Sequence, residues 1–182
     1  MASINNSLPF AIGTTSTSGI YAALVGQLYK DFSTTYGERI FRLAKCGATA
    51  LPANAAVVSA VSSGKKTWVC TTNTAGASSQ VAGVLPIEYT GTAAVAIDAY
   101  FLLQVGGNCP VIAGDTLFSS LSGVESRLVT GSGGSGYVRQ IAAFTTASTT
   151  EDYGVFALAS NTVAATAAGQ LVRALLRVSL DD

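Results

Sequence analysis

The chain of 182 residues contains no histidine and little charge. Without histidine, a Ser-His-Asp triad, a Cys-His catalytic pair and every histidine-ligated metal site are excluded. Charged residues make up 11% of the sequence, against about 25% in an ordinary soluble domain. The ten basic residues balance the ten acidic ones. A broad basic surface of the kind that binds nucleic acid is therefore not expected.

Cysteine is also scarce. The three cysteines, Cys46, Cys70 and Cys109, are odd in number and show no C-x-x-C spacing. Without histidine, a zinc site built from them would lack a fourth protein ligand. We expect them to be small buried hydrophobic residues in a protein that folds in a reducing, intracellular environment. No metal and no cofactor is predicted.

Long hydrophobic runs are missing too. The nearest approach is the uncharged stretch 153–172, whose apolar residues are mainly alanine and which polar residues interrupt. Alanine contributes little to the free energy of membrane insertion. The first ten residues, MASINNSLPF, have neither the basic nor the apolar region of a signal peptide. We expect a soluble protein with no membrane partner.

What the sequence does contain indicates a folded, β-rich protein. Hydrophobic residues make up 49% of the chain and the mean hydropathy is +0.44, which excludes general disorder. From Ile20 onward, short apolar runs alternate with glycine, serine and threonine, as in a series of short strands. We predict an all-β fold, a small β-barrel or β-sandwich of about ten short strands. The expected strands lie near residues 40–44, 57–61, 67–70, 81–87, 95–105, 115–121, 127–130, 137–144 and 155–159.

Two segments are ambiguous between helix and strand. Residues 20–29 suit either, although Gly26 weakens a helix. In residues 171–180, Val172, Ala174 and Leu176 share one face at a period of two, while Arg173 and Arg177 are also spaced as on a helix. Gly169 and the short length favour a strand for this second segment.

The N-terminus differs from the rest. Residues 1–19 are rich in polar residues around one apolar group formed by Leu8, Pro9, Phe10 and Ile12, and they show neither a helical nor a strand period. We expect an extended arm that becomes ordered on a partner surface, with a frayed terminus as the alternative. The chain is accordingly divided into an N-terminal arm and docking segment, 1–36, and a β-rich globular domain, 37–182. We expect a chain without residues 1–19 to fold.

Several motifs that could carry chemistry have simpler explanations. Residues 131–136, GSGGSG, satisfy a dinucleotide-binding pattern, but a strand-like segment follows where a helix is required. The S-x-x-K match at residues 62–65 contains a glycine and suits a solvated turn. The acidic residues show no spacing typical of a catalytic pair; six of them are Glu88, Asp98, Asp115, Glu125, Glu151 and Asp152. No catalytic residue is predicted, and the protein is not expected to be an enzyme.

A resemblance to a known family rests on five short segments in a fixed order. They are residues 37–45 (GERIFRLAK), 81–84 (VAGV), 113–117 (AGDTL), 154–158 (GVFAL) and 172–177 (VRALLR). This pattern resembles the head decoration, or cement, proteins of tailed bacteriophages over about residues 37–180. The resemblance implies a β-rich structural protein, made in the host cytoplasm, that sits on the outer surface of the virion capsid. It implies that the major capsid protein is the partner, that neighbouring capsomers are stapled together, and that the chain self-associates as a homotrimer.

The residues expected at the capsid or at an intersubunit contact are aromatic, aliphatic and basic residues of the first 42 positions. They are Leu8, Phe10, Ile12, Tyr21, Tyr29, Phe32, Tyr36, Arg39 and Arg42. Two alternatives stay open. One is another phage surface module of a tail, a fibre or a host-binding part, and the other is a hydrolase that uses the scattered carboxylates.

Overall fold

The fold is taken from a computed structural model of the chain. The structure describes residues 4–52, 57–60, 68–72, 81–90, 95–112, 127–130, 138–140, 157–159 and 171–178. The predicted strand at 115–121, the S-x-x-K match at 62–65 and the glycine-rich segment 131–136 lie outside these residues.

Strands dominate the described residues, in agreement with the all-β prediction. They are β1 (Ile4–Asn5), β2 (Leu28–Ser33), β3 (Gly37–Cys46), β4 (Val57–Ala60), β5 (Val69–Thr72), β6 (Val81–Val84), β7 (Tyr100–Ile112), β8 (Arg127–Thr130), β9 (Val138–Gln140), β10 (Ala157–Ala159) and β11 (Leu171–Arg177). A single 3-10 helix, η1 (Gly19–Leu24), precedes β2 in this part of the chain.

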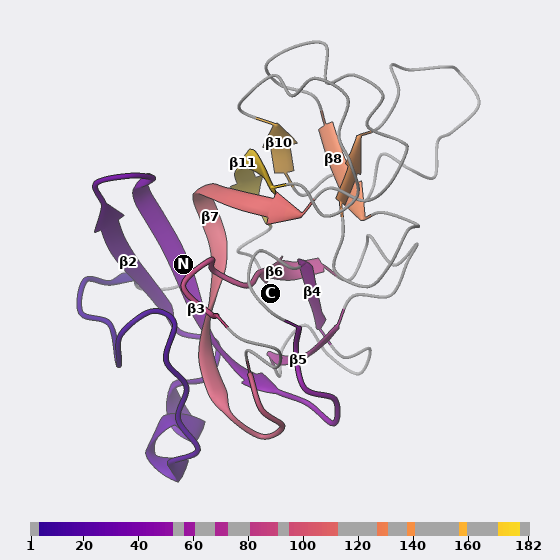
Figure 1. Cartoon of the computed structure of the whole chain (residues 1–182). Coiled ribbons are helices and arrows are strands. Elements are labelled where there is room, and N and C mark those ends of the chain that lie inside the picture. Colours follow the sequence, from indigo (N-terminus) through magenta and orange to yellow (C-terminus); the bar gives the residue numbers. More distant parts are fainter. Residues whose placement is uncertain are drawn as a thin grey trace.

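The strands form one mixed sheet in the order β1-β2-β3-β5-β4-β6-β7-β11-β10-β8-β9. Strand β7 also pairs with β3, antiparallel from Lys45↔Tyr100 to Arg39↔Gly107. The pairings β3–β5–β4–β6–β7–β3 therefore make a circuit. One residue pair, Val84↔Gln104, joins β6 to β7, so the sheet is strongly curled but not closed into a barrel. In Figure 1, β2 lies at the margin of the sheet and β3 lies between β2 and β7.

The long strand β7 is buried along most of its length because apolar side chains cover both of its faces. On one face Phe101, Leu103 and Val105 join a large core cluster, and on the other face Tyr100 and Leu102 join a second cluster. This continuous apolar run is typical of a strand that is covered on both sides. The predicted strand at 95–105 begins later than expected, because residues before Tyr100 form a turn in which Asp98 has a positive φ of 62°.

The two ambiguous segments are resolved by tertiary packing. Residues 20–29 divide into η1 and the start of β2. Gly26 separates them with a φ of +91°, and a Cβ atom there would lie 2.9 Å from the Trp68 ring. Strand β11 is formed as predicted: Val172, Ala174 and Leu176 are buried, whereas Leu171 and Arg173 are exposed.

The N-terminal residues 4–36 contribute two strands to the sheet. Strand β1 pairs with β2 in parallel, and β2 pairs with β3 from Leu28↔Arg42 to Ser33↔Gly37. The boundary expected after residue 36 therefore falls in the turn of the β2–β3 hairpin.

Candidate functional site

An apolar layer from the N-terminal segment covers one face of the sheet. We call it the N-terminal layer. Its members are Leu8, Phe10, Ile12, Tyr21, Leu24 and Val25, all partly buried, and they pack against Tyr29, Phe41, Leu43, Tyr100 and Leu102. The edge of the Phe10 ring meets Tyr21 at 5.1 Å between ring centroids, and Tyr21 lies 6.1 Å from Tyr100. Four of the predicted contact residues therefore have their main contacts within the chain.

Hydrogen bonds fasten this layer to the sheet. Ser16 and Tyr100 exchange backbone hydrogen bonds of 3.1 and 2.7 Å. The Tyr89 hydroxyl donates to the carbonyl oxygen of Thr14 at 3.1 Å and accepts the N–H of Leu102 at 2.8 Å. Burial raises the pKa of Tyr89, so its phenol stays protonated and able to donate. The segment is thus a structural part of the sheet, and its removal would expose the apolar cluster beneath it.

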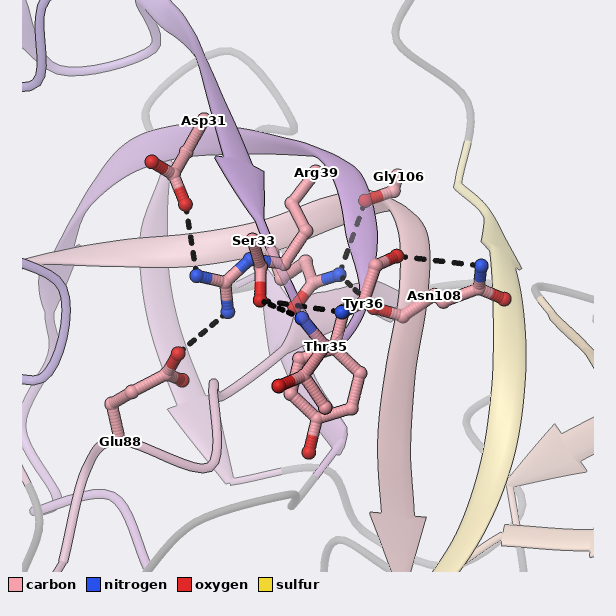
Figure 2. A network of polar contacts seen from close by, with 9 residues as sticks. Asp31, Ser33, Thr35, Tyr36, Arg39, Glu88, Gly106 and Asn108 are labelled. Atoms are coloured by element: carbon pink, nitrogen blue, oxygen red, sulfur yellow. Dashed lines mark hydrogen bonds and ion pairs between the residues drawn. The ribbon is translucent and has the colours of Figure 1, made fainter.

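A buried arginine links the edge of the sheet to the segment after β6 (Figure 2). Arg39 of β3 donates from Nη1 to Glu88 Oε1 at 2.6 Å and from Nη2 to Asp31 Oδ2 at 2.9 Å. Its side chain is 6% exposed, and its guanidinium lies 5.1 Å from the Phe41 ring centroid. Burial by itself lowers the pKa of Arg39, but the hydrogen bonds with Glu88 and Asp31 outweigh it and raise the pKa. Arg39 therefore holds β2 and residue 88 in place.

The turn between β2 and β3 is also held by specific contacts, several of them visible in Figure 2. The Ser33 hydroxyl accepts the N–H groups of Thr35 and Tyr36, each at 3.2 Å. Asn108 donates its side-chain amide to the Tyr36 carbonyl oxygen at 3.4 Å. Gly37 closes the turn with a φ of +74°, as expected for a three-residue hairpin loop that ends in a left-handed glycine. The end of β2 is therefore fixed in space.

Arg42, on the opposite face of β3, is also internal. It is 1% exposed, and its guanidinium carbon lies 3.6 Å from the centroid of the Trp68 ring, a cation–π arrangement. Tyr29 is 3% exposed. Both arginines were expected at the capsid or at an intersubunit contact. Within this chain Arg39 pairs with Glu88 and Arg42 packs on Trp68, because the fold brings these distant segments together.

Of the predicted contact residues, Phe32 has the most exposed side chain. Phe32 of β2 is 75% exposed. Tyr36 is half-buried, with the guanidinium groups of Arg39 and Arg173 at 5.8 and 5.7 Å from its ring centroid. Sequence reasoning missed Ile20, which is 72% exposed in η1. The sequence does not indicate whether Ile20 or its neighbour Tyr21 is the exposed residue, because this depends on how η1 packs against the sheet.

A shallow hollow of about 570 Å³ lies beside the N-terminal layer. Its lining combines apolar and amide side chains from Asn5, Asn6, Ser7, Leu8, Pro9, Leu24 and Tyr29. Gln27 Oε1 accepts from both the Asn5 amide and the Tyr29 hydroxyl at 3.2 Å. These bonds tie the end of β1 to the start of β2.

The described residues offer little for catalysis. No group of three or more His, Cys, Asp or Glu side chains that could hold a metal ion occurs among them. The three cysteines are buried free thiols, as predicted, and burial raises their pKa. Glu88 pairs with Arg39 and Asp98 pairs with Lys45 at 2.7 Å. The acids at 115, 125, 151 and 152 lie outside the described residues. No helix in the described part is long and apolar enough to cross a membrane.

Comparisons with known proteins add one structural similarity. No family model and no curated protein matches the chain. Among solved structures, the N base of the head fiber gp8.5 of bacteriophage phi29 matches with a TM-score of 0.35 and 16% sequence identity. The match covers 79% of this chain and 99% of the phage protein chain. At this TM-score the similarity carries no argument about function.

Proposed function

We propose that this chain is a structural protein of a phage virion that binds the outer surface of the capsid and joins neighbouring capsomers. The family resemblance of the five sequence segments supports this role. The observation that carries it is the exposure of two large apolar side chains, Ile20 at 72% and Phe32 at 75%, on a segment whose other aromatic residues are buried or half-buried. Exposed apolar groups on a firmly packed support are a feature of protein–protein contact surfaces.

The proposed mode of action is adhesion. Burying a side chain such as phenylalanine or isoleucine in a partner contributes about 1.5–3 kcal/mol, which is modest for one contact. On a capsid lattice, each contact benefits from the effective concentration set by its neighbours, so modest contacts add up to stable attachment. The partners in this proposal are the major capsid protein and further copies of this chain. The chain has a structural role in this proposal, with no enzymatic one.

The test uses heads of the virion that carries the protein, stripped of it. We expect the variant with Ile20→Ser and Phe32→Ser to bind such heads at least tenfold more weakly than the natural chain. Ile97→Ser is a matched control, because Ile97 is 51% exposed but lies outside the N-terminal segment. Undiminished binding by the double variant would contradict the proposed surface. Electron microscopy of labelled particles tests the location, and label on the tail instead of the shell would support the alternative of a tail or fibre module.

A further inference from the structure

The edge strand β2 is only partly paired on its outer side. Strand β1 pairs with β2 at Leu28 and Tyr29. Among the described residues, no strand pairs with the outer edge from Lys30 to Ser33. Such an edge is a template for another strand. It is also rigid, because β3, the Ser33 turn and the Arg39 ion pairs hold it from the inner side.

The register shows which backbone groups point outward. The N–H of Leu43 donates to the carbonyl oxygen of Gln27 at 3.0 Å, and these two residues face each other in the β2–β3 register. Hydrogen-bonded and non-hydrogen-bonded pairs alternate along an antiparallel ladder. The backbone groups of Asp31 and Ser33 are therefore directed at β3, while those of Lys30 and Phe32 are directed away from the sheet. The parallel pairing of Asn5 with Tyr29 uses the Lys30 N–H, so the free edge presents the Lys30 carbonyl and the N–H and carbonyl groups of Phe32.

From this geometry we propose that the outer edge of β2 pairs antiparallel with β2 of a second copy of this chain, about a two-fold axis at Phe32. Phe32 exchanges both backbone hydrogen bonds with Phe32 of the second copy, and Asp31 lies opposite the second copy's Ser33. The two exposed phenylalanine rings lie on the same face and cover each other. This inference specifies one contact between copies of this chain within the proposed function, and it requires no capsid.

Two observations favour this register over its neighbours. An axis at Asp31 would place the second copy's Ser33 beside Tyr29, where Asn5 of β1 already pairs. An axis at Lys30 would bring two ammonium groups directly opposite each other, which is destabilising. With the axis at Phe32, the new strand clears β1 because the second copy's hairpin turns away after Ser33.

The side chains of Lys30 and Phe32 favour a second copy as the occupant. Lys30 forms an ion pair with Glu38 on the face that carries Phe32. In the proposed register, Lys30 of each chain is the diagonal neighbour of the other chain's Phe32, within reach of its ring. No like charges lie opposite each other across the axis. A two-fold edge contact joins two chains, which makes it distinct from the three-fold assembly that the family resemblance implies.

The test is disulfide trapping of the purified chain with oxidised glutathione. Phe32→Cys places two thiols on the axis, where a hydrogen-bonded pair has Cα atoms about 5.5 Å apart, inside the range of about 4.4–6.8 Å that a disulfide spans. Ile20→Cys is the matched control, because Ile20 is 72% exposed and Phe32 is 75% exposed. The natural cysteines are all buried and contribute little background. We expect the Phe32→Cys chain to form disulfide-linked dimers at least tenfold faster than the Ile20→Cys chain.

Equal cross-linking rates for Phe32→Cys and Ile20→Cys would overturn the proposal. If the rates are equal while Phe32→Ala still weakens binding to stripped heads, the edge accepts a segment of the head protein and the second copy is wrong. Rapid cross-linking of the Phe32→Cys chain would leave this pairing standing. If the variant with Ile20→Ser and Phe32→Ser still binds stripped heads as the natural chain does, the proposed function is contradicted.

Discussion

Replacing Arg39 is the sharpest test of how the edge of the sheet is held. Arg39→Met keeps the approximate length of the side chain but removes the cation that Asp31 and Glu88 share. The two carboxylates then face each other across an apolar side chain. Burial makes this costly, because water has little access to replace the lost hydrogen bonds.

The magnitude follows from the burial of the three groups. Removing one partner of a fully buried ion pair costs about 3–5 kcal/mol. Here the arginine side chain is 6% exposed, but Asp31 and Glu88 are 28% and 33% exposed, so water can solvate part of the residual charge. We expect Arg39→Met to lower the free energy of unfolding by about 2–4 kcal/mol.

Urea denaturation followed by circular dichroism measures this loss. The matched control is Lys30→Met, which breaks an ion pair with Glu38 whose side chains are 43% and 53% exposed and should cost at most about 1 kcal/mol. Adding Asp31→Asn and Glu88→Gln to Arg39→Met should restore part of the stability, because the uncompensated charges disappear. Equal losses for Arg39→Met and Lys30→Met would refute the reasoning.

Three further outcomes follow from the packing. Gly107→Ala should lower the free energy of unfolding by at least about 2 kcal/mol, because Gly107 has a φ of +84° and a Cβ would collide with the Glu38 carbonyl oxygen. Thermal melting measures this loss, and Gly19→Ala is the control because nothing lies within 4 Å of a Cβ at that position. Phe10→Ala should cost about 1–3 kcal/mol in urea denaturation, since the ring is only partly buried, and an unchanged midpoint would contradict the structural role of the N-terminal layer. Burial raises the pKa of Tyr89 and of the three thiols, so the unfolded chain loses these protons at lower pH than the folded chain does. The free energy of unfolding should therefore fall above about pH 8.5, by up to about 1.4 kcal/mol per pH unit for each titrating group. An unfolding free energy that stays constant from pH 7 to about 10.5 would contradict this.

Local patterns in the sequence were sufficient for much of the fold. Strand β11 was predicted because the alternation of Val172, Ala174 and Leu176 is a property of neighbouring residues. The beginning of β7 was not predicted. It depends on the positive φ of Asp98 and on a hydrogen bond from the Cys46 N–H to the Ala99 carbonyl oxygen, and that bond joins distant positions.

The candidate surface was harder to predict, for a related reason. Residues of the first 42 positions were expected at the capsid or at an intersubunit contact, but sequence does not say which of them have partners within the chain. Arg39 finds its second partner 49 residues away, and Arg42 stacks on Trp68. Sequence also gives no sign that Phe10 and Ser16 contact strands formed much later in the chain; the folding of a chain without residues 1–19 stays a prediction. Phe32 is exposed on β2, a strand near the edge of the sheet. The order of strands in a sheet cannot be read from local sequence.

The stacking of Arg42 on Trp68 gives the protein an intrinsic optical reporter. Trp68 is the only tryptophan in the chain, and it is 5% exposed at the point where β3 and β5 meet. Its fluorescence therefore reports a single location, free of overlapping emission from other indoles. When the guanidinium leaves the ring and solvent arrives, the emission maximum moves to longer wavelength. Loss of this junction can thus be followed in real time without attaching a dye.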